Sequence, residues 1–216
     1  MQNERVDLRT SSDEVARILR NLIASGDMRA GTKLDEVRLS ERLGVSRTPL
    51  REAIIGLEHE GWVRRVPNKG ARVVAADERL VREIYPVLGA LECEAVRLSG
   101  ERLVRSADAL RQVNEKLRRA DRRPEQHKLD AQFHRMLVEQ CENPRLLALI
   151  ESHWALARRF DGAFERGTAN HGGSCDQHEE IVEALVAGKV EGAAELLREH
   201  WQQGVEVVCE WLRSNG

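Results

Sequence analysis

Apolar residues in the first part of the chain recur every three or four positions, which is the spacing of an amphipathic helix. Ser11 or Ser12 can cap such a helix, and we expect it to end near Gly26. Its predicted buried face consists of Val15, Ile18, Leu19, Leu22 and Ile23. A turn and a short extended piece over residues 29–34 follow, and we expect this piece to pair with a later hairpin.

The stretch 37–72 predicts a short helix, a tight turn, a second helix and a hairpin. Leu39 and Leu43 fall on one face of the first helix, as expected for a helix that packs on a core. Gly44 follows directly, and glycine adopts the positive φ that ends many helices at little cost. The turn between the two helices is therefore predicted to be short.

The second helix of this stretch is predicted to begin beside Pro49, because proline is tolerated in the first turn of a helix. Ser46 and Thr48 can accept hydrogen bonds from the free N–H groups at this end. Arg47, Thr48 and Arg51 are left together on one side, because the apolar residues recur at i, i+4 and i+7 on the other. Those apolar residues are Leu50, Ile54 and Leu57.

A basic hairpin is predicted next, because two β-prone runs, 62–66 and 71–74, flank the turn-forming residues Pro67-Asn68-Lys69-Gly70. Lys69 lies at its tip, with Arg64, Arg65 and Arg72 nearby. A single arginine is usually a solvated surface residue. A helix N-terminus with two arginines beside a basic hairpin is instead typical of a winged helix-turn-helix that binds DNA.

From residue 75 onward the chain shows only helical periodicity, so the predicted fold is mainly α, a winged helix-turn-helix over 1–76 followed by an all-α bundle over 77–216. Pro86 lies inside the first bundle helix and is expected to kink or restart it. A break is also expected over Gly167–Gly173. The six predicted helices span residues 78–99, 101–120, 125–141, 144–165, 174–187 and 190–213.

The charges are distributed unevenly between these two parts. Residues 1–75 contain 14 basic and 11 acidic residues, a net charge of +3, whereas the remainder contains 20 basic and 25 acidic residues, a net charge of −5. The whole chain has a formal net charge of −2. This balance argues against a protein that coats nucleic acid indiscriminately and favours a local basic surface on an acidic body.

The four cysteines are widely separated and form no CxxC pair, which favours reduced thiols in a cytoplasmic protein. Redox sensing by these thiols is the less favoured alternative, because free cysteine usually behaves as a small buried hydrophobe. No apolar run approaches the roughly 18 residues that a membrane-spanning helix needs. We therefore expect a cytoplasmic protein without a membrane partner.

The N-terminal part closely resembles the DNA-binding domain of the GntR family of bacterial transcription regulators, through LGVSRTPLREAI and the wing EGWVRRVPNKGARV. The helical part resembles the FCD ligand-binding domain of the FadR subgroup. The segments that carry this second resemblance are ALECEAVRL (90–98), DAQFHRML (130–137), ENPRLL (142–147), SCDQHEEIVEAL (174–185) and LREHW (197–201). Together they imply a dimeric regulator that binds a palindromic operator and responds to a small molecule, commonly an organic acid, in the helical domain.

The resemblance to GntR regulators also implies which residues contact bases and phosphates. Some members of the family have an arginine where this chain has Val37, so this role passes only to the neighbouring Arg38. The expected DNA-binding residues are Arg38, Ser46, Arg47, Thr48, Arg51, Lys69 and Gly70.

Four residues of the helical part form a candidate metal site. Asp130 and His134 are four positions apart, so their side chains point the same way from one helix. His178 and His200 lie on the apolar faces of two further helices. One inward histidine is usually neutral and hydrogen-bonded, but three of them with an aspartate, spread over three helices that must pack together, favour a metal ion.

The resemblance to FCD domains supports the same site, because these four positions hold a divalent metal in the metal-binding branch of that family. Three imidazoles and one carboxylate suit Zn, Ni, Mn or Fe(II). Arg158 and Arg159 are expected to line the same pocket and bind an anionic effector, although both are equally well explained as solvated. Many relatives carry an arginine where this chain has Leu88, which implies a different or less charged effector.

Two alternatives stay open at this point. The helical domain can be a metal-dependent enzyme, although we identify no placed general base and therefore expect no enzyme. The metal can also be purely structural and stiffen the bundle without contacting the effector.

Overall fold

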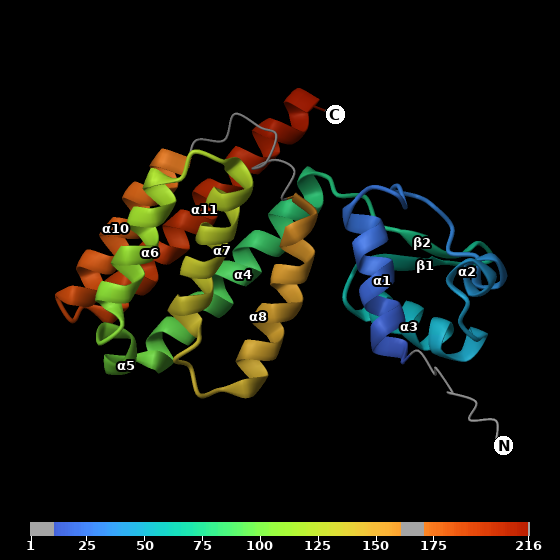
Figure 1. The fold of residues 1–216 in the computed structure, drawn as a ribbon, viewed down its shortest axis with the longest axis horizontal. Helices are drawn as coiled ribbons and strands as arrows, with labels where there is room; N and C mark the ends of the chain where they lie inside the picture. The colour runs from blue at the N-terminus through green and yellow to red at the C-terminus, as the bar shows by residue number, and fades with distance from the viewer. Residues whose placement is uncertain (1–10, 161–170, 216) are drawn as a thin grey trace, which may run out of the picture. The chain divides into compact units, whose positions relative to one another are not determined.

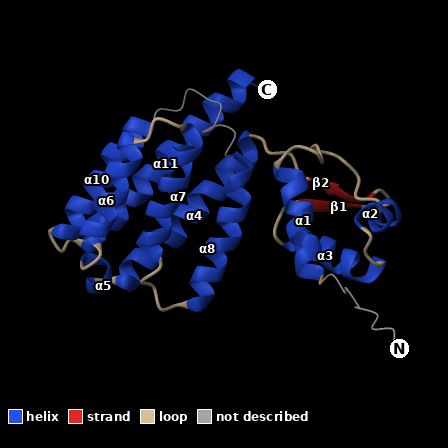
Figure 2. Cartoon of the chain, in the orientation of Figure 1, coloured by secondary structure: helices blue, strands red, loops and turns tan. Residues whose placement is uncertain are grey.

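The computed structural model describes residues 11–160 and 171–215, and the chain divides into two compact units, Met1–Ala75 and Ala76–Gly216. All described strands lie in the first unit, and the described part of the second is helical (Figures 1 and 2). This confirms the predicted fold class. None of the described helices is both long and apolar enough to cross a membrane.

In its described residues, 11–75, the first unit contains three helices and a two-stranded antiparallel sheet. Its core is formed by the apolar faces of α1 and α3 together with Trp62, which is 2% exposed. Burying these faces supplies most of the driving force for the fold. The elements are α1 (Ser12–Ala24), α2 (Glu36–Leu43), α3 (Arg47–His59), β1 (Val63–Val66) and β2 (Gly70–Val73).

Helix α2 begins and ends where its local sequence demands. The Asp35 side chain accepts hydrogen bonds from the backbone N–H groups of Val37 and Arg38, which have no partner inside the helix. At the other end Gly44 adopts a φ of 66°, the left-handed conformation in which a side chain would be strained. The predicted short turn into α3 is confirmed.

The predicted hairpin is also confirmed, with Val63 paired to Val73 and Val66 paired to Gly70. Its turn contains Asn68 at a φ of 60°, a conformation that asparagine tolerates better than most residues. The extended piece before α2 pairs with this hairpin as predicted, through a single bridge between Lys33 and Arg72.

The second unit is a helical bundle in which α4 packs along α11, and α10 packs against α6 and α11. Apolar side chains from most of its helices meet in one core. Its elements are α4 (Glu78–Ser99), α5 (Glu101–Val104), α6 (Ala107–Arg119), α7 (Arg123–Val138), α8 (Pro144–Ala157), η1 (Arg158–Phe160), α10 (His171–Val186) and α11 (Val190–Asn215).

One boundary in the first half of the bundle differs from prediction. The helix predicted over 101–120 is divided into α5 and α6, and Ser106 at the division donates its hydroxyl to the Arg102 carbonyl, an alternative to the helical ladder. Helix α4, in contrast, does not restart at Pro86. Pro86 is exposed, so water can satisfy the carbonyl that loses its N–H partner.

Two further boundaries differ around the residues that the structure leaves undescribed. The helix predicted over 144–165 ends at Ala157 and continues as a 3-10 turn to Phe160, while residues 161–165 lie outside the described residues. Helix α10 begins at His171, so the loop predicted through Gly173 is wrong over its last three residues. A hydrogen bond from Ser174 to Asp130 on α7 anchors this first turn and offsets the low helix propensity of glycine.

Candidate functional site

Seven side chains or backbone positions of the first unit were predicted to contact DNA, and all of them are exposed. On α3 the buried residues include Leu50 and Leu57, both 0% exposed, so the basic residues at its start face the other way. This leaves a helix N-terminus with exposed cations, which suits a phosphate backbone. The seven are Arg38, Ser46, Arg47, Thr48, Arg51, Lys69 and Gly70.

The start of α3 differs from prediction in one detail. Ser46 occupies the N-cap position, but its side chain makes no capping hydrogen bond. The backbone at this position already has the extended conformation of an N-cap, while the serine hydroxyl remains exposed.

Arg51 forms an ion pair with Glu36 of α2, with 2.9 Å between Nη2 and Oε2. Its side chain is nevertheless 60% exposed, and a surface pair of this kind is weak. The guanidinium can therefore exchange its carboxylate for a phosphate or a base at small cost.

The basic residues of the hairpin fall into two groups. Arg65 pairs with Glu58, and Arg72 donates to the carbonyl of Gly31, so both are held within the unit. Lys69 lies on the exposed turn, next to Gly70 with its φ of 78°. Lys69 at the tip and the exposed Arg64 are therefore the hairpin cations most available to a partner.

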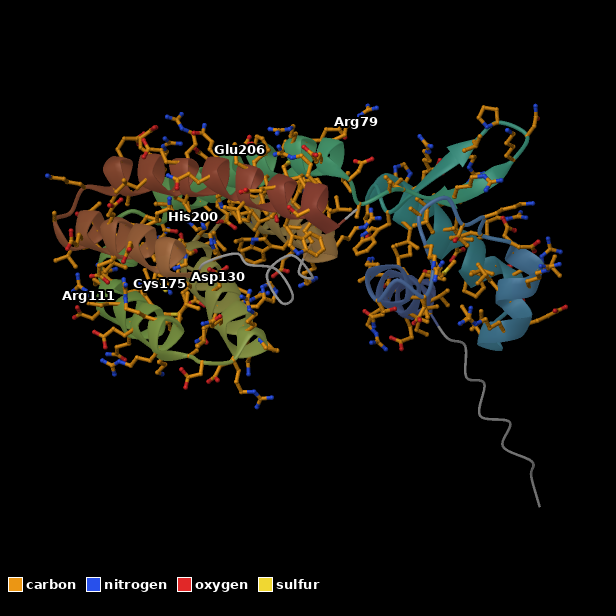
Figure 3. All side chains as sticks on the ribbon, turned by 90° about the horizontal axis from the view of Figure 1, so that it is seen from above. Arg79, Arg111, Asp130, Cys175, His200 and Glu206 are labelled. Atoms are coloured by element: carbon orange, nitrogen blue, oxygen red, sulfur yellow. The ribbon has the colours of Figure 1, made fainter. Side chains whose placement is uncertain are left out.

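In the second unit the structure brings the four predicted metal ligands together. The ligand nitrogens of His134 on α7, His178 on α10 and His200 on α11 all lie within 4.8 Å of one another. Asp130 joins them, with its Oδ1 3.8 Å from Nε2 of His178. Figure 3 labels Asp130 and His200, which lie near each other inside the bundle.

Hydrogen bonds fix the orientation of two of these imidazoles. Nδ1 of His134 lies 2.9 Å from the Glu92 carboxylate, which can only accept, so this nitrogen carries the proton. Nδ1 of His200 lies 2.9 Å from the side-chain oxygen of Gln177 and donates in the same way. The two Nε2 atoms then face each other at 3.1 Å with a lone pair on each.

Two facing lone pairs repel, so this arrangement needs a proton or a cation between the rings. Burial lowers the pKa of His134, but the adjacent Glu92 carboxylate outweighs it and the net shift is upward. Burial and the facing His134 lower the pKa of His200 to about 3. Nitrogen lone pairs converging with a carboxylate also fit a divalent metal.

Glu92 was not predicted from the sequence as part of the site. Its side chain is 0% exposed, and besides His134 it accepts hydrogen bonds from the indole N–H groups of Trp154 at 2.6 Å and Trp201 at 2.9 Å. A signal was available, because Glu92 lies four residues after Leu88 and four before Val96 and so falls on the apolar face of its helix. A carboxylate in that position needs N–H partners.

A cavity of about 250 Å³ opens beside the histidines. His134, His200 and Asp130 line it, together with the aromatic side chains of Trp154 and Trp201. Neither tryptophan was predicted to lie here, and His127, which had no partner predicted from the sequence, also lines the cavity.

The two arginines predicted for the effector do not share this cavity. Arg158 lines it, whereas Arg159 is not among its described lining residues, because consecutive residues of a helical turn point in different directions. Burial lowers the pKa of Arg159 to about 10, although Asp77 opposes this shift. Leu88, at 0% exposure, packs into the bundle core and does not line the cavity either.

Comparisons with known proteins agree with the two units. The family model of bacterial regulatory proteins of the gntR family matches residues 11–73, and that of the FCD domain matches residues 83–203. The Nta operon transcriptional regulator of Aminobacter aminovorans is 32% identical over 202 residues, covering 89% of this chain and 91% of that protein. The transcriptional repressor GlaR of Escherichia coli is 27% identical over 217 residues, covering 92% and 96%.

A solved structure extends the likeness to the fold. A GntR-family transcriptional regulator from Pseudomonas syringae pv. tomato superposes with a TM-score of 0.57 at 28% identity, covering 94% of this chain and 88% of that one. The matching families and these relatives are transcription regulators rather than enzymes. The chain therefore belongs to the GntR family of bacterial regulatory proteins, with an FCD domain as its helical unit.

Proposed function

We propose that this protein is a ligand-responsive transcription regulator that binds a palindromic operator as a homodimer. The exposed cationic start of α3 carries the proposal, because Arg47 and Arg51 there oppose the buried face of the helix. Arginine is the residue best suited to paired hydrogen bonds with guanine in the major groove. Two copies related by a twofold axis fit the two halves of a palindrome.

The helical unit is proposed to sense a small organic-acid-like metabolite at a metal centre. Asp130, His134, His178 and His200 would hold a divalent Zn, Ni, Mn or Fe ion, which when bound supplies a Lewis-acidic point for an oxygen ligand. Arg158 offers a cation to a carboxylate in the same cavity. Trp154 and Trp201 contribute apolar ring faces for the body of such a ligand, because Glu92 occupies their N–H groups.

Selection of bound duplexes from a random DNA pool tests the proposal, followed by a metabolite screen for release. We expect an enriched palindrome, and we expect Arg47→Ala and Arg51→Ala each to weaken binding to it by about 1–3 kcal/mol for every hydrogen-bonded base that the arginine reads. Gel-shift titration against the selected sequence measures the change in affinity, and circular dichroism checks that both variants stay folded.

Arg17→Ala is the matched control, because Arg17 is an equally exposed arginine of the same unit that lies on α1 and pairs with Glu14. Its affinity for the selected sequence is expected to equal that of the unsubstituted protein. Unchanged affinity in both α3 variants would remove the proposed mechanism.

A purely structural metal is the remaining alternative, because the three histidines join three helices whether or not a ligand contacts the ion. In that case chelation lowers the melting temperature but leaves effector affinity unchanged. The alternative of a metal-dependent enzyme has no support among the relatives, which are regulators.

A further inference from the structure

Glu92 contacts both a candidate metal ligand and the walls of the proposed effector cavity. Its Oε2 accepts from His134 at 2.9 Å and from Trp201 at 2.9 Å, while its Oε1 accepts from Trp154 at 2.6 Å. These three donors come from α7, α11 and α8, and Glu92 itself from α4. One buried carboxylate thus connects four helices.

The three donors to Glu92 differ in whether they are candidate metal ligands, line the cavity, or do both. His134 is a candidate metal ligand and also lines the cavity, whereas both tryptophans line the cavity and ligate nothing. The ring of Trp201 also packs against that of His134, with centroids 5.1 Å apart. Trp154 has no such ring contact among the described aromatic pairs, so Glu92 is its connection to the histidines.

We propose that Glu92 is a positioning residue that sets the tautomer of His134 and holds the two indole walls, so that metal binding and the shape of the effector cavity depend on one carboxylate. This inference rests on the proposed metal centre. A carboxylate that accepts from Nδ1 leaves Nε2 free to ligate. If the acceptor were removed, the proton could move to Nε2 and block it.

The test compares binding of Zn²⁺ alone to the full-length protein and to Glu92→Gln. Glutamine keeps the shape but has one accepting oxygen where the carboxylate has two, so its amide nitrogen must face either Trp154 or His134 and Trp201 and cannot accept from them. It also removes the negative charge that favours the proton on Nδ1 of His134. We expect Zn²⁺ affinity to fall about 10- to 100-fold, the usual effect of removing a partner that orients a ligand. Competition against a chromophoric chelator measures the affinity, and the visible spectrum of bound Co²⁺ is expected to differ between the two proteins.

Val96→Ala is the control for a merely structural role, because Val96 lies one turn further along α4 and is also 0% exposed. It is expected to lower the melting temperature without changing Zn²⁺ affinity. Equal Zn²⁺ affinity in Glu92→Gln and the unsubstituted protein would overturn the role of Glu92 while leaving the metal centre in place. Absence of Zn²⁺ uptake by the unsubstituted protein would overturn the metal centre and the inference together.

A second measurement does not depend on the folding of Glu92→Gln. Zn²⁺ titration of the unsubstituted protein is expected to change tryptophan emission, because the ion alters the histidine that shares Glu92 with both indoles. Trp154→Phe, which removes both the indole donor to Glu92 and its own emission, is expected to leave only the part of the change that comes from Trp201. An emission change that is absent, or equal in both proteins, contradicts the coupling.

Discussion

Glu36 forms an ion pair with Arg51 and therefore competes with DNA for the Arg51 guanidinium. Both side chains belong to the first unit and are partly exposed, at 60% and 30%. A phosphate or base must replace the carboxylate when Arg51 contacts DNA, and the carboxylate itself repels the phosphate backbone. A residue outside the predicted DNA-binding set is therefore expected to influence affinity.

We expect Glu36→Gln to raise operator affinity, by up to about fivefold, because exposed ion pairs contribute roughly 0 to 1 kcal/mol. The increase should shrink at high salt, where surface charges are screened. Gel-shift titrations at two salt concentrations measure both effects. Glu14→Gln, which breaks the comparable surface pair with Arg17, serves as the control. Weaker binding by Glu36→Gln would mean that Glu36 orients Arg51 for DNA instead of competing for it.

At the scale of single elements, two glycines of the first unit have opposite roles. Gly44 ends α2 in the left-handed conformation, whereas Gly56 lies inside α3. A Cβ added at either position meets no atom within 4 Å, so space does not distinguish them. Backbone conformation does, because only Gly44 has the positive φ that disfavours a side chain.

We expect Gly44→Ala to destabilise the first unit by about 1 kcal/mol and Gly56→Ala to stabilise it by about 0.5 to 1 kcal/mol. Urea unfolding followed by circular dichroism compares both variants with the unsubstituted protein. The two substitutions add the same methyl group and serve as each other's control. The same sign of change in both would refute the conformational explanation.

At the scale of the whole molecule, the candidate metal site joins α7 to the two consecutive helices α10 and α11, which follow it more than 30 residues later. A ligand that binds only the folded state stabilises it, by about 2.7 kcal/mol at a free concentration 100 times its dissociation constant. A metal bound at this site would therefore raise the stability of the bundle.

We expect removal of the metal by a chelator to lower the melting temperature by roughly 5–10 °C, and adding Zn²⁺ back to restore it. His134→Ala and His178→Ala should melt at the same temperature with and without the chelator. His153→Ala, a histidine of α8 that bonds to the Leu149 carbonyl, should respond like the unsubstituted protein. Thermal melts with elemental analysis test this, and a chelator without effect on the metal-loaded protein would contradict it.

Local chemistry in the sequence predicted much of the first unit. Gly44 at a helix end, Pro49 in a first turn and Asn68 in a hairpin each occupy the conformation that their side chain favours. Such preferences involve only neighbouring residues and can be read from a single sequence. The predicted convergence of His134, His178 and His200 also agrees with the structure, since spacing placed their side chains on inward faces, and Asp130 lies 3.8 Å from His178.

Features that depend on distant contacts were predicted poorly. The early start of α10 depends on a hydrogen bond from Ser174 to Asp130, 44 residues away, that local propensity does not encode. The core position of Leu88 depends on the packing of the bundle and could not be read from the sequence. Arg158 and Arg159 were both predicted to line the effector pocket. Their side chains point in different directions from the 3-10 turn, and only Arg158 is among the described lining residues of the cavity.

The sequence by itself indicated the family through the resemblance of its motifs. Its local periodicity and composition predicted the order of the elements and the residue types available for a DNA surface and a metal centre. Only the tertiary structure decided what surrounds them. Glu92 acquires its role from three N–H donors that lie 42 to 109 residues away in the chain. A buried carboxylate is stable only where such donors converge, and convergence is a property of the packed bundle.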